Sequence, residues 1–260
     1  MMRGLATAIG FLTAVPIGAR GELRDGDFGR ASVWFPAVGL LVGLLLAGVD
    51  WCGRAVWDPT VAGALVIGAA VVVTGGLHLD GLMDTADAFF SRASRERMLE
   101  IMRDPRSGAL GVAAGVCVLL TKFAAYSHLG GRDAYGATAA AGLEHWRVIA
   151  AAPALGRLAM VIAVGAFPYA RETGTGARIA AEVGMQHVIG ALVLGAAIAV
   201  GLLSVGGLLV FAMALALAVA GGGYARRRLG GMTGDVYGAI NEVVEVAVLL
   251  LGAVIVGGLT

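Results

Sequence analysis

The chain has 260 residues, of which 58% are hydrophobic and only 14% are charged, and its mean hydropathy is +0.85. A soluble domain has about half apolar and about a quarter charged residues, so this composition excludes an ordinary water-soluble fold. A net charge of +1 excludes a global attraction for nucleic acid, so any basic binding site must be local.

The N-terminal segment is apolar but short. It carries one early basic residue, Arg3, and no small-x-small cleavage site, so we do not expect a cleaved signal peptide. At about 1.5 Å per residue, the run from Leu5 to Ala19 is too short to cross about 30 Å of hydrocarbon. We therefore expect an interfacial or re-entrant helix here.

Long apolar runs predict an all-α, polytopic membrane protein with about seven transmembrane helices, in one membrane domain over 1–260. The 42 glycines fit this prediction, because glycine lets membrane helices pack closely. The fourth run is overlong and contains Pro153, so we expect a tilted or broken helix there. The predicted spans are 33–51, 60–79, 108–128, 135–167, 184–203, 205–223 and 236–258.

The basic residues are divided unequally by these seven crossings. Most of the 19 Lys and Arg residues fall on one side, and only Arg54 and Arg132 fall on the other. By the positive-inside rule the basic side faces the cytoplasm, which predicts a multi-pass protein of the cell (inner) membrane with a cytoplasmic site. The loops expected to form that site lie near 20–32, 80–107, 168–183 and 224–235.

The two cysteines, Cys52 and Cys117, occur in apolar runs. They form no CxxC or Cys/His metal pattern. We interpret both as buried thiols of the protein core.

An acidic segment follows the second predicted span. Asp80, Asp84 and Asp87 stand at i, i+4 and i+7, on one face if the helix continues. Three carboxylates at such short distances repel one another unless a cation or basic side chains neutralise their charge. Oxygen ligands favour Mg²⁺, with Mn²⁺ as the alternative, and Mg²⁺ usually completes its shell with substrate phosphates. The segment therefore suggests diphosphate chemistry, and helix capping is the competing interpretation.

Three further ionisable residues lie in apolar helices. His78 points to another side of the helix from Asp80, so we interpret it as an interfacial hydrogen-bonding residue, with ligand or acid–base duty as the second option. Glu242 and Glu245 stand at i and i+3 in the last span, which indicates that they face a polar cavity.

A basic stretch precedes the third span. Ser94 is predicted to cap a surface helix that reaches Asp104. Arg103 and Arg106 then flank Asp104 just before a helix N-terminus, and both guanidinium groups and N-terminal amides favour phosphate. Phosphate binding and topology setting stay open for the two arginines, as do metal binding and a salt bridge for Asp104.

Two more cationic or glycine-rich stretches occur later. Arg157 lies inside the fourth span, and Arg171 precedes a glycine-rich loop. Asp235 ends the turn before the last span, where it either caps that helix or joins the acidic cluster.

Together these segments resemble the bacterial cobalamin synthase (adenosylcobinamide-GDP ribazoletransferase) family over nearly the whole chain. Four spaced motifs in order are specific, whereas one alone would not be. Two departures are that Ala88 stands where the family often has Gly, and that Pro105 in Arg-Asp-Pro-Arg changes the expected turn. The motifs are GGLHLDGLMDTAD (75–87), SRERMLEIMRDPRSGALG (94–111), GR followed by YARETGTG (156–176) and GGMTGD (230–235), with FPAVGLLVG (35–43) consistent.

The resemblance implies a Mg²⁺-dependent transferase of the last steps of cobalamin biosynthesis. It joins α-ribazole, or its 5′-phosphate, to adenosylcobinamide-GDP with loss of GMP, as an alcohol oxygen attacks the corrinoid-side phosphorus. Asp80, Asp84 and Asp87 are expected to serve as metal ligands and base. The carboxylates expected at the metal are Asp80, Asp84, Asp87, Asp104 and Asp235. The arginines expected at the phosphates are Arg103, Arg106, Arg157 and Arg171.

The implied partners are the two substrates and the lipid bilayer, with no nucleic acid. A homo-oligomer or a complex with other corrinoid-pathway enzymes is left open. A CDP-alcohol phosphotransferase is the enzymatic alternative, although Asp84 replaces the Ala-Arg pair of its pattern. An ion-coupled transporter would use Asp80, Asp84 and Glu242 as a relay, but it predicts inverted repeats that the sequence lacks. A non-catalytic membrane scaffold is the last alternative.

Overall fold

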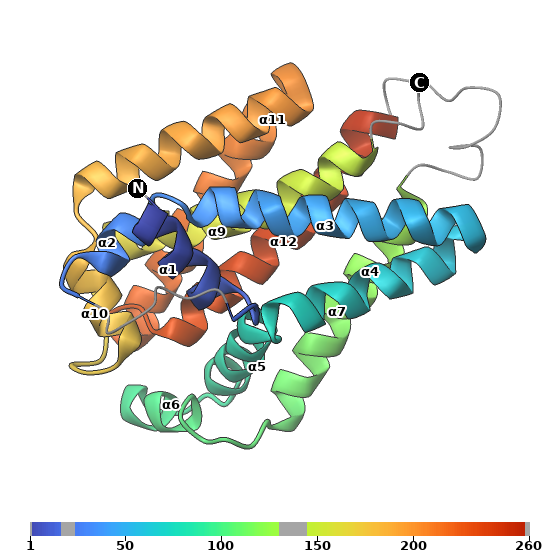
Figure 1. Ribbon diagram of the computed structural model, residues 1–260. Helices are drawn as coiled ribbons and strands as arrows, with labels where there is room; N and C mark the ends of the chain where they lie inside the picture. Colours follow the sequence, from blue (N-terminus) through green and yellow to red (C-terminus); the bar gives the residue numbers. More distant parts are fainter. Residues whose placement is uncertain (1, 17–23, 130–144, 258–260) are drawn as a thin grey trace.

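The computed structural model describes residues 2–16, 24–129 and 145–257, and over these residues the protein is all-α (Figure 1). The helices are α1 (Met2–Leu12), α2 (Asp27–Ser32), α3 (Phe35–Val56), α4 (Pro59–Thr74), α5 (Leu77–Phe90), α6 (Arg95–Ile101), α7 (Ala109–His128), α9 (His145–Ala166), α10 (Thr175–Glu182), α11 (Met185–Leu229) and α12 (Gly234–Gly257).

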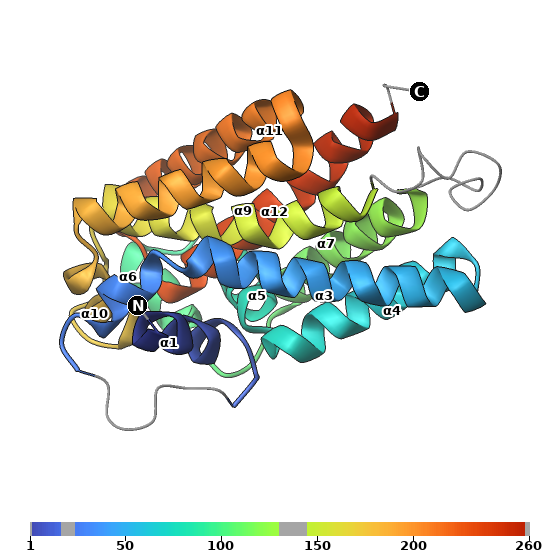
Figure 2. The same cartoon turned by 45° about the horizontal axis from the view of Figure 1, so that its top comes forward.

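Helix α9 is the centre of the bundle, because 94% of its most apolar 18-residue stretch is buried inside the protein. Helices α3, α11 and α12 pack around it (Figure 2). Gly39 and Gly43 of α3 lie directly on the α9 backbone at Pro153 and Ala150, where a side chain would collide. The expectation of a break at Pro153 is wrong, since α9 runs through it as one helix. The expected start of this span, 135–144, lies outside the described residues.

The bundle has enough long apolar helices to cross a bilayer several times. Five qualify alone (α3, α7, α9, α11 and α12), and α4 with α5 makes a sixth if the pair is one broken span. The 45-residue α11 breaks at Ser204, whose φ of 52° and ψ of −136° are not helical, and folds back so that Gly207 meets the backbone of Ala199. If its two arms each cross, the predicted seven crossings are reached.

The second predicted span, 60–79, is wrong at its C-terminal end. Gly75 and Gly76 both adopt left-handed conformations, with φ of 63° and 69°, which end α4 at Thr74. Helix α5 starts at Leu77 after a 91° bend. The acidic segment therefore occupies a helix of its own, turned toward α12 and α7 (Figure 1).

The interpretation of the cysteines as core thiols is also wrong. Cys52 on α3 and Cys117 on α7 are both exposed. They lie among exposed apolar side chains such as Trp51 and Val116, on faces that a bilayer would cover. A membrane helix is apolar on its lipid-facing side too, so an apolar neighbourhood does not indicate burial.

The N-terminal helix is short, as expected, and α1 ends at Leu12. Phe11 stacks on Phe35 of α3, with ring centroids 5.9 Å apart, and meets Phe28 of α2 edge-on. The predicted surface helix is confirmed as α6, where the Ser94 hydroxyl accepts a hydrogen bond from the Arg97 amide.

Candidate active site

A pocket of about 370 Å³ brings together three of the motif segments. Helix α5 contributes Asp80, helix α10 contributes Thr175 and Gly176, and the start of α12 contributes Asp235. The other lining residues are mainly apolar and come from α1, α3, α5, α9, α10 and α12. A mostly apolar pocket with a few convergent polar groups is the usual form of a small-molecule site. The remaining lining residues are Phe11, Phe35, Leu77, His78, Gly81, Met160, Val164, Ile179, Gly234, Tyr237 and Gly238.

The crossing of α5 and α12 positions the acidic side chains. A Cβ atom on Gly81 would lie 2.8 Å from the backbone oxygen of Asp235, and one on Gly238 would lie 3.0 Å from the backbone oxygen of His78. Only glycine permits so close an approach. Because the backbones touch here, the carboxylates of α5 face Asp235 although they are separated by about 150 residues of sequence.

Asp84 is a half-buried member of this acidic group, as are Asp87 and Asp235, whereas Asp80 is exposed. Its carboxylate interacts electrostatically with those of Asp80, Asp235 and Asp87, and with one cation, the Arg171 guanidinium. Arg171 donates a hydrogen bond to Asp235 at 2.9 Å. The group therefore has more negative than positive charge.

A divalent cation fits this charge excess. Within the described part of the chain, no three Asp, Glu, His or Cys side chains are close enough to form a metal cage. Mg²⁺ does not require one, since it is usually held by one or two carboxylates together with substrate phosphates. Asp80, Asp84 and Asp235 are the carboxylates that could hold it.

Asp87 has another partner than the expected metal. Its two carboxylate oxygens accept hydrogen bonds from the amides of Gly108 at 2.6 Å and Gly111 at 2.7 Å. These amides lie at the N-terminus of α7, where a carboxylate satisfies unpaired donors and the helix dipole. The Asp87 carboxylate thus caps the N-terminus of the neighbouring helix α7.

The basic loop after α6 does not line the pocket. Arg106 is exposed and holds Asp104 through two side-chain hydrogen bonds of 2.9 Å. This pairing lowers the pKa of Asp104 to about 2. Arg103 is exposed in the turn that follows α6. The sequence left metal binding and a salt bridge open for Asp104, and the structure shows the salt bridge to Arg106.

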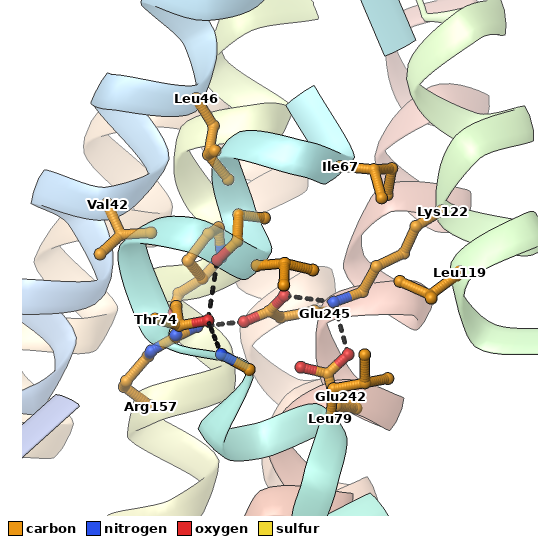
Figure 3. A pocket seen from close by; sticks show the side chains of 14 residues that line it. Val42, Leu46, Ile67, Thr74, Leu79, Leu119, Lys122, Arg157, Glu242 and Glu245 are labelled. Atoms are coloured by element: carbon orange, nitrogen blue, oxygen red, sulfur yellow. Dashed lines mark hydrogen bonds and ion pairs between the residues drawn. The ribbon is translucent and has the colours of Figure 1, made fainter. Parts of the chain in front are cut away.

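Arg157 and Glu242 belong to a buried ionic network between α7, α9 and α12 (Figure 3). Lys122 donates to Glu242 at 2.7 Å and to Glu245 at 2.6 Å, and Arg157 pairs with Glu245. Two cations balance two carboxylates, which leaves Arg157 engaged and not free for a phosphate. Glu242 is likewise tied to Lys122, which disfavours the transporter relay. Lys122, a lone lysine in an apolar run, was the available signal for this network.

His78 is buried, with 2% of its surface exposed. It forms part of the pocket wall, and its Nδ1 atom lies 3.2 Å from Nη2 of Arg157. The imidazole therefore connects the ionic network with the pocket.

Tyr237 and Thr175 are pocket residues that were not predicted. Tyr237 is buried and stacks on Tyr169, with ring centroids 6.2 Å apart. Met232 lies opposite Tyr169: its amide donates to the backbone oxygen of Pro168 at 2.8 Å and its backbone oxygen accepts from the Ala170 amide at 2.8 Å, which joins the loops before α10 and α12. The motifs YARETGTG and GGMTGD contain these residues, but neither spacing shows that the two loops pair.

Comparisons with known proteins identify the family of the chain. The chain matches the family described as "Cobalamin-5-phosphate synthase" over residues 4–253. The adenosylcobinamide-GDP ribazoletransferase of Chlorobaculum tepidum is 36% identical over 100% of this chain and 98% of its own. Proteins of the same name from Roseiflexus sp. (strain RS-1) and Klebsiella pneumoniae (strain 342) are 37% and 36% identical, over 94% and 96% of this chain and 87% and 99% of theirs. No solved structure matches at a significant level.

Proposed function

The chain belongs to the cobalamin-5-phosphate synthase family, and from this premise we propose that it is the membrane transferase that joins adenosylcobinamide-GDP to α-ribazole or α-ribazole 5′-phosphate. Its relatives are named for this ribazole transfer. The products are adenosylcobalamin, or its 5′-phosphate, and GMP.

The observation that carries the proposal is the position of Asp84. Its carboxylate interacts with those of Asp80, Asp235 and Asp87 and with the Arg171 guanidinium, and two of these neighbours, Asp80 and Asp235, line the pocket that three motif segments share. A diphosphate substrate brings further negative charge, so it requires a divalent cation in this place. Mg²⁺ bound by Asp80, Asp84 or Asp235 would neutralise charge on the diphosphate, and Mn²⁺ is the alternative.

The reaction forms one P–O bond and breaks another. An alcohol oxygen of the ribazole attacks the corrinoid-side phosphorus, the bond to the GMP oxygen breaks, and the hydroxyl proton passes to a carboxylate. We assign that acceptor to Asp84, since Asp87 is occupied by the α7 amides and Asp235 by Arg171. Arg171, which donates to Asp235 at 2.9 Å, would hold a phosphate beside these carboxylates.

Two cavities meet at the proposed reaction centre. Asp80, Leu77 and Phe11 line both the 370 Å³ pocket and an open groove of about 660 Å³ beside the α4–α5 bend. A reaction between two substrates requires that both be held with their reacting atoms close together. We assign the enclosed pocket to a nucleoside-sized part and the open groove to the much larger corrinoid.

We also propose that this end of the bundle faces the cytoplasm, in the cell (inner) membrane. Arg226, Arg227 and Arg228 lie in the last turn of α11, and Arg95 of α6 donates to the backbone oxygen of Leu229 beside them. The concentration of arginine at this end supports that orientation by the positive-inside rule.

The test uses purified protein in liposomes with adenosylcobinamide-GDP, α-ribazole and Mg²⁺, and it measures GMP release. We expect release that depends on the divalent ion, and a loss of about 10²–10⁴-fold in Asp84→Asn, the range for removal of a general base. The matched control is Asp104→Asn, which removes a carboxylate outside the pocket and leaves activity near wild type. Metal-independent product, or full activity of Asp84→Asn, would contradict the mechanism.

A further inference from the structure

Arg157 approaches His78 in a geometry that determines which ring nitrogen carries the proton. The Nη2 atom of Arg157 lies 3.2 Å from Nδ1 of His78. A guanidinium has five N–H donors and no acceptor, and it stays protonated in proteins. Nδ1 must therefore accept this hydrogen bond, because two donors cannot pair. The ring proton then lies on Nε2, and the imidazole is neutral.

The Nε2 atom of His78 is buried, yet it has no hydrogen-bond partner within the described residues. An unpaired buried donor costs about 1–3 kcal/mol, so such an atom calls for a partner, either an ordered water or a ligand. His78 belongs to the wall of the pocket that also contains Asp80 and Asp235. The missing partner is therefore expected to be a ligand in that pocket.

We propose that His78 is a substrate-contacting residue whose Nε2–H donates a hydrogen bond to a phosphoryl oxygen of the diphosphate substrate, and that Arg157 is the positioning residue that fixes this tautomer. The inference rests on the proposed function and adds two roles to it. His78 supplies a neutral donor beside the carboxylates, and Arg157 acts through His78 without touching the substrate.

The buried network holds Arg157 in place from three helices. Glu245 of α12 pairs with Arg157 and also accepts from Lys122 of α7 at 2.6 Å and from Asn241 at 2.9 Å. Figure 3 shows Glu245 between Lys122 and Arg157. Gly156 packs directly on Asn241, so α9 and α12 are in close contact at this level. A preorganised donor needs such a fixed support, because its catalytic value lies in not having to reorient.

The first measurement reads the tautomer without any substrate. The protein is labelled with ¹⁵N-histidine in lipid nanodiscs, and His78→Gln identifies the His78 signals by their loss. We expect a pyridine-like Nδ1 and a pyrrole-like Nε2. Addition of adenosylcobinamide-GDP and Mg²⁺, without the ribazole, should then shift the Nε2–H signal. A ring with the proton on Nδ1, or a doubly protonated ring, would overturn the proposal.

The second measurement compares two amides at position 78. A Gln amide reaches the Nε2 position and can donate there, whereas an Asn amide reaches only Nδ1. We expect His78→Asn to lower kcat by about 10²-fold, the loss typical of one oxyanion donor, and His78→Gln to retain at least about ten times the activity of His78→Asn. Equal losses in the two variants would overturn the role of Nε2–H. His128→Gln, at an exposed histidine of α7, is the control and should be unaffected.

The third measurement tests Arg157 without leaving an unpaired charge. Arg157→Met combined with Glu245→Met removes one cation and one carboxylate, and the Lys122–Glu242 pair stays intact. We expect the folded double variant to show both His78 tautomers and a reduced kcat. A single unchanged tautomer in this variant would overturn the positioning role. Since the NMR signals require no turnover, an inactive wild-type protein with the predicted tautomer would contradict only the proposed function.

Discussion

Asp84 and Asp87 are three residues apart on α5 but have different surroundings. Asp84 is half-buried among the carboxylates of Asp80 and Asp235, whereas Asp87 accepts two backbone hydrogen bonds from the first turn of α7. At the scale of single residues, the acidic motif therefore contains one carboxylate that we assign to the reaction, Asp84, and one that caps a helix, Asp87. The close fit at Gly108 and Gly111 supports this division, because a Cβ on either glycine would collide with the Asp87 carboxylate.

Substitution of Asp87 tests that division. Asp87→Asn replaces one accepting oxygen by a donor and removes the charge at the α7 N-terminus, so we expect a loss of about 1 kcal/mol in stability. The amides of Gly108 and Gly111 should exchange hydrogen faster, while GMP release falls less than tenfold. A loss of activity as large as that of Asp84→Asn, with unchanged amide exchange, would instead assign Asp87 to the metal.

The crossing of α5 and α12 is the element-scale feature on which the site depends. Gly81 and Gly238 bring the two backbones together, and the bend at Gly75 and Gly76 directs α5 toward α12. The site is thus built by helix packing at small residues and not by a long loop. This mode of packing is characteristic of membrane helices.

A methyl group at position 81 should separate these helices. The Cβ of Gly81→Ala would lie 2.8 Å from the Asp235 backbone oxygen, and overpacking of this kind costs about 1–3 kcal/mol. We expect at least about a tenfold loss of kcat/KM, measured by GMP release, because the α5 carboxylates move away from Asp235. Gly48→Ala is the control, since Gly48 lies on α3 away from the pocket and a Cβ there meets open space. Similar activity of both variants would show that the crossing is not needed.

At the scale of the whole molecule, a second buried ionic cluster lies in the part of the bundle formed by α3, α7 and α9. Asp50 accepts hydrogen bonds from Arg54 at 2.9 Å and contacts Nε2 of His145 at 2.9 Å, and Arg54 donates to the backbone oxygen of Tyr126 at 2.6 Å. Arg54, which follows the first predicted span, lies in the last turn of α3, and its side chain is buried in this cluster. The bundle is held by buried polar contacts as well as by apolar packing.

Removal of one partner from this cluster should destabilise the bundle strongly. Asp50→Asn leaves the Arg54 guanidinium buried without its charge partner, which typically costs about 3–5 kcal/mol. Thermal unfolding in detergent measures the effect. Arg97→Ala, which breaks the exposed Arg97–Glu100 pair, is the control and should cost less than about 1 kcal/mol. If the two variants unfold alike, the cluster does not stabilise the fold.

The sequence by itself determined that the protein is an all-α membrane protein, because apolar runs of this length are typical of helices that cross a bilayer. It also indicated Asp80, Asp84 and Asp235 as residues of the site, through unusual carboxylates at the ends of apolar helices. Only the tertiary structure decided the partners. Helix packing paired Asp87 with the α7 amides and Arg157 with Glu245, and it placed Cys52 on the surface. A membrane helix is apolar both where it meets lipid and where it meets protein, so hydropathy alone does not distinguish its faces.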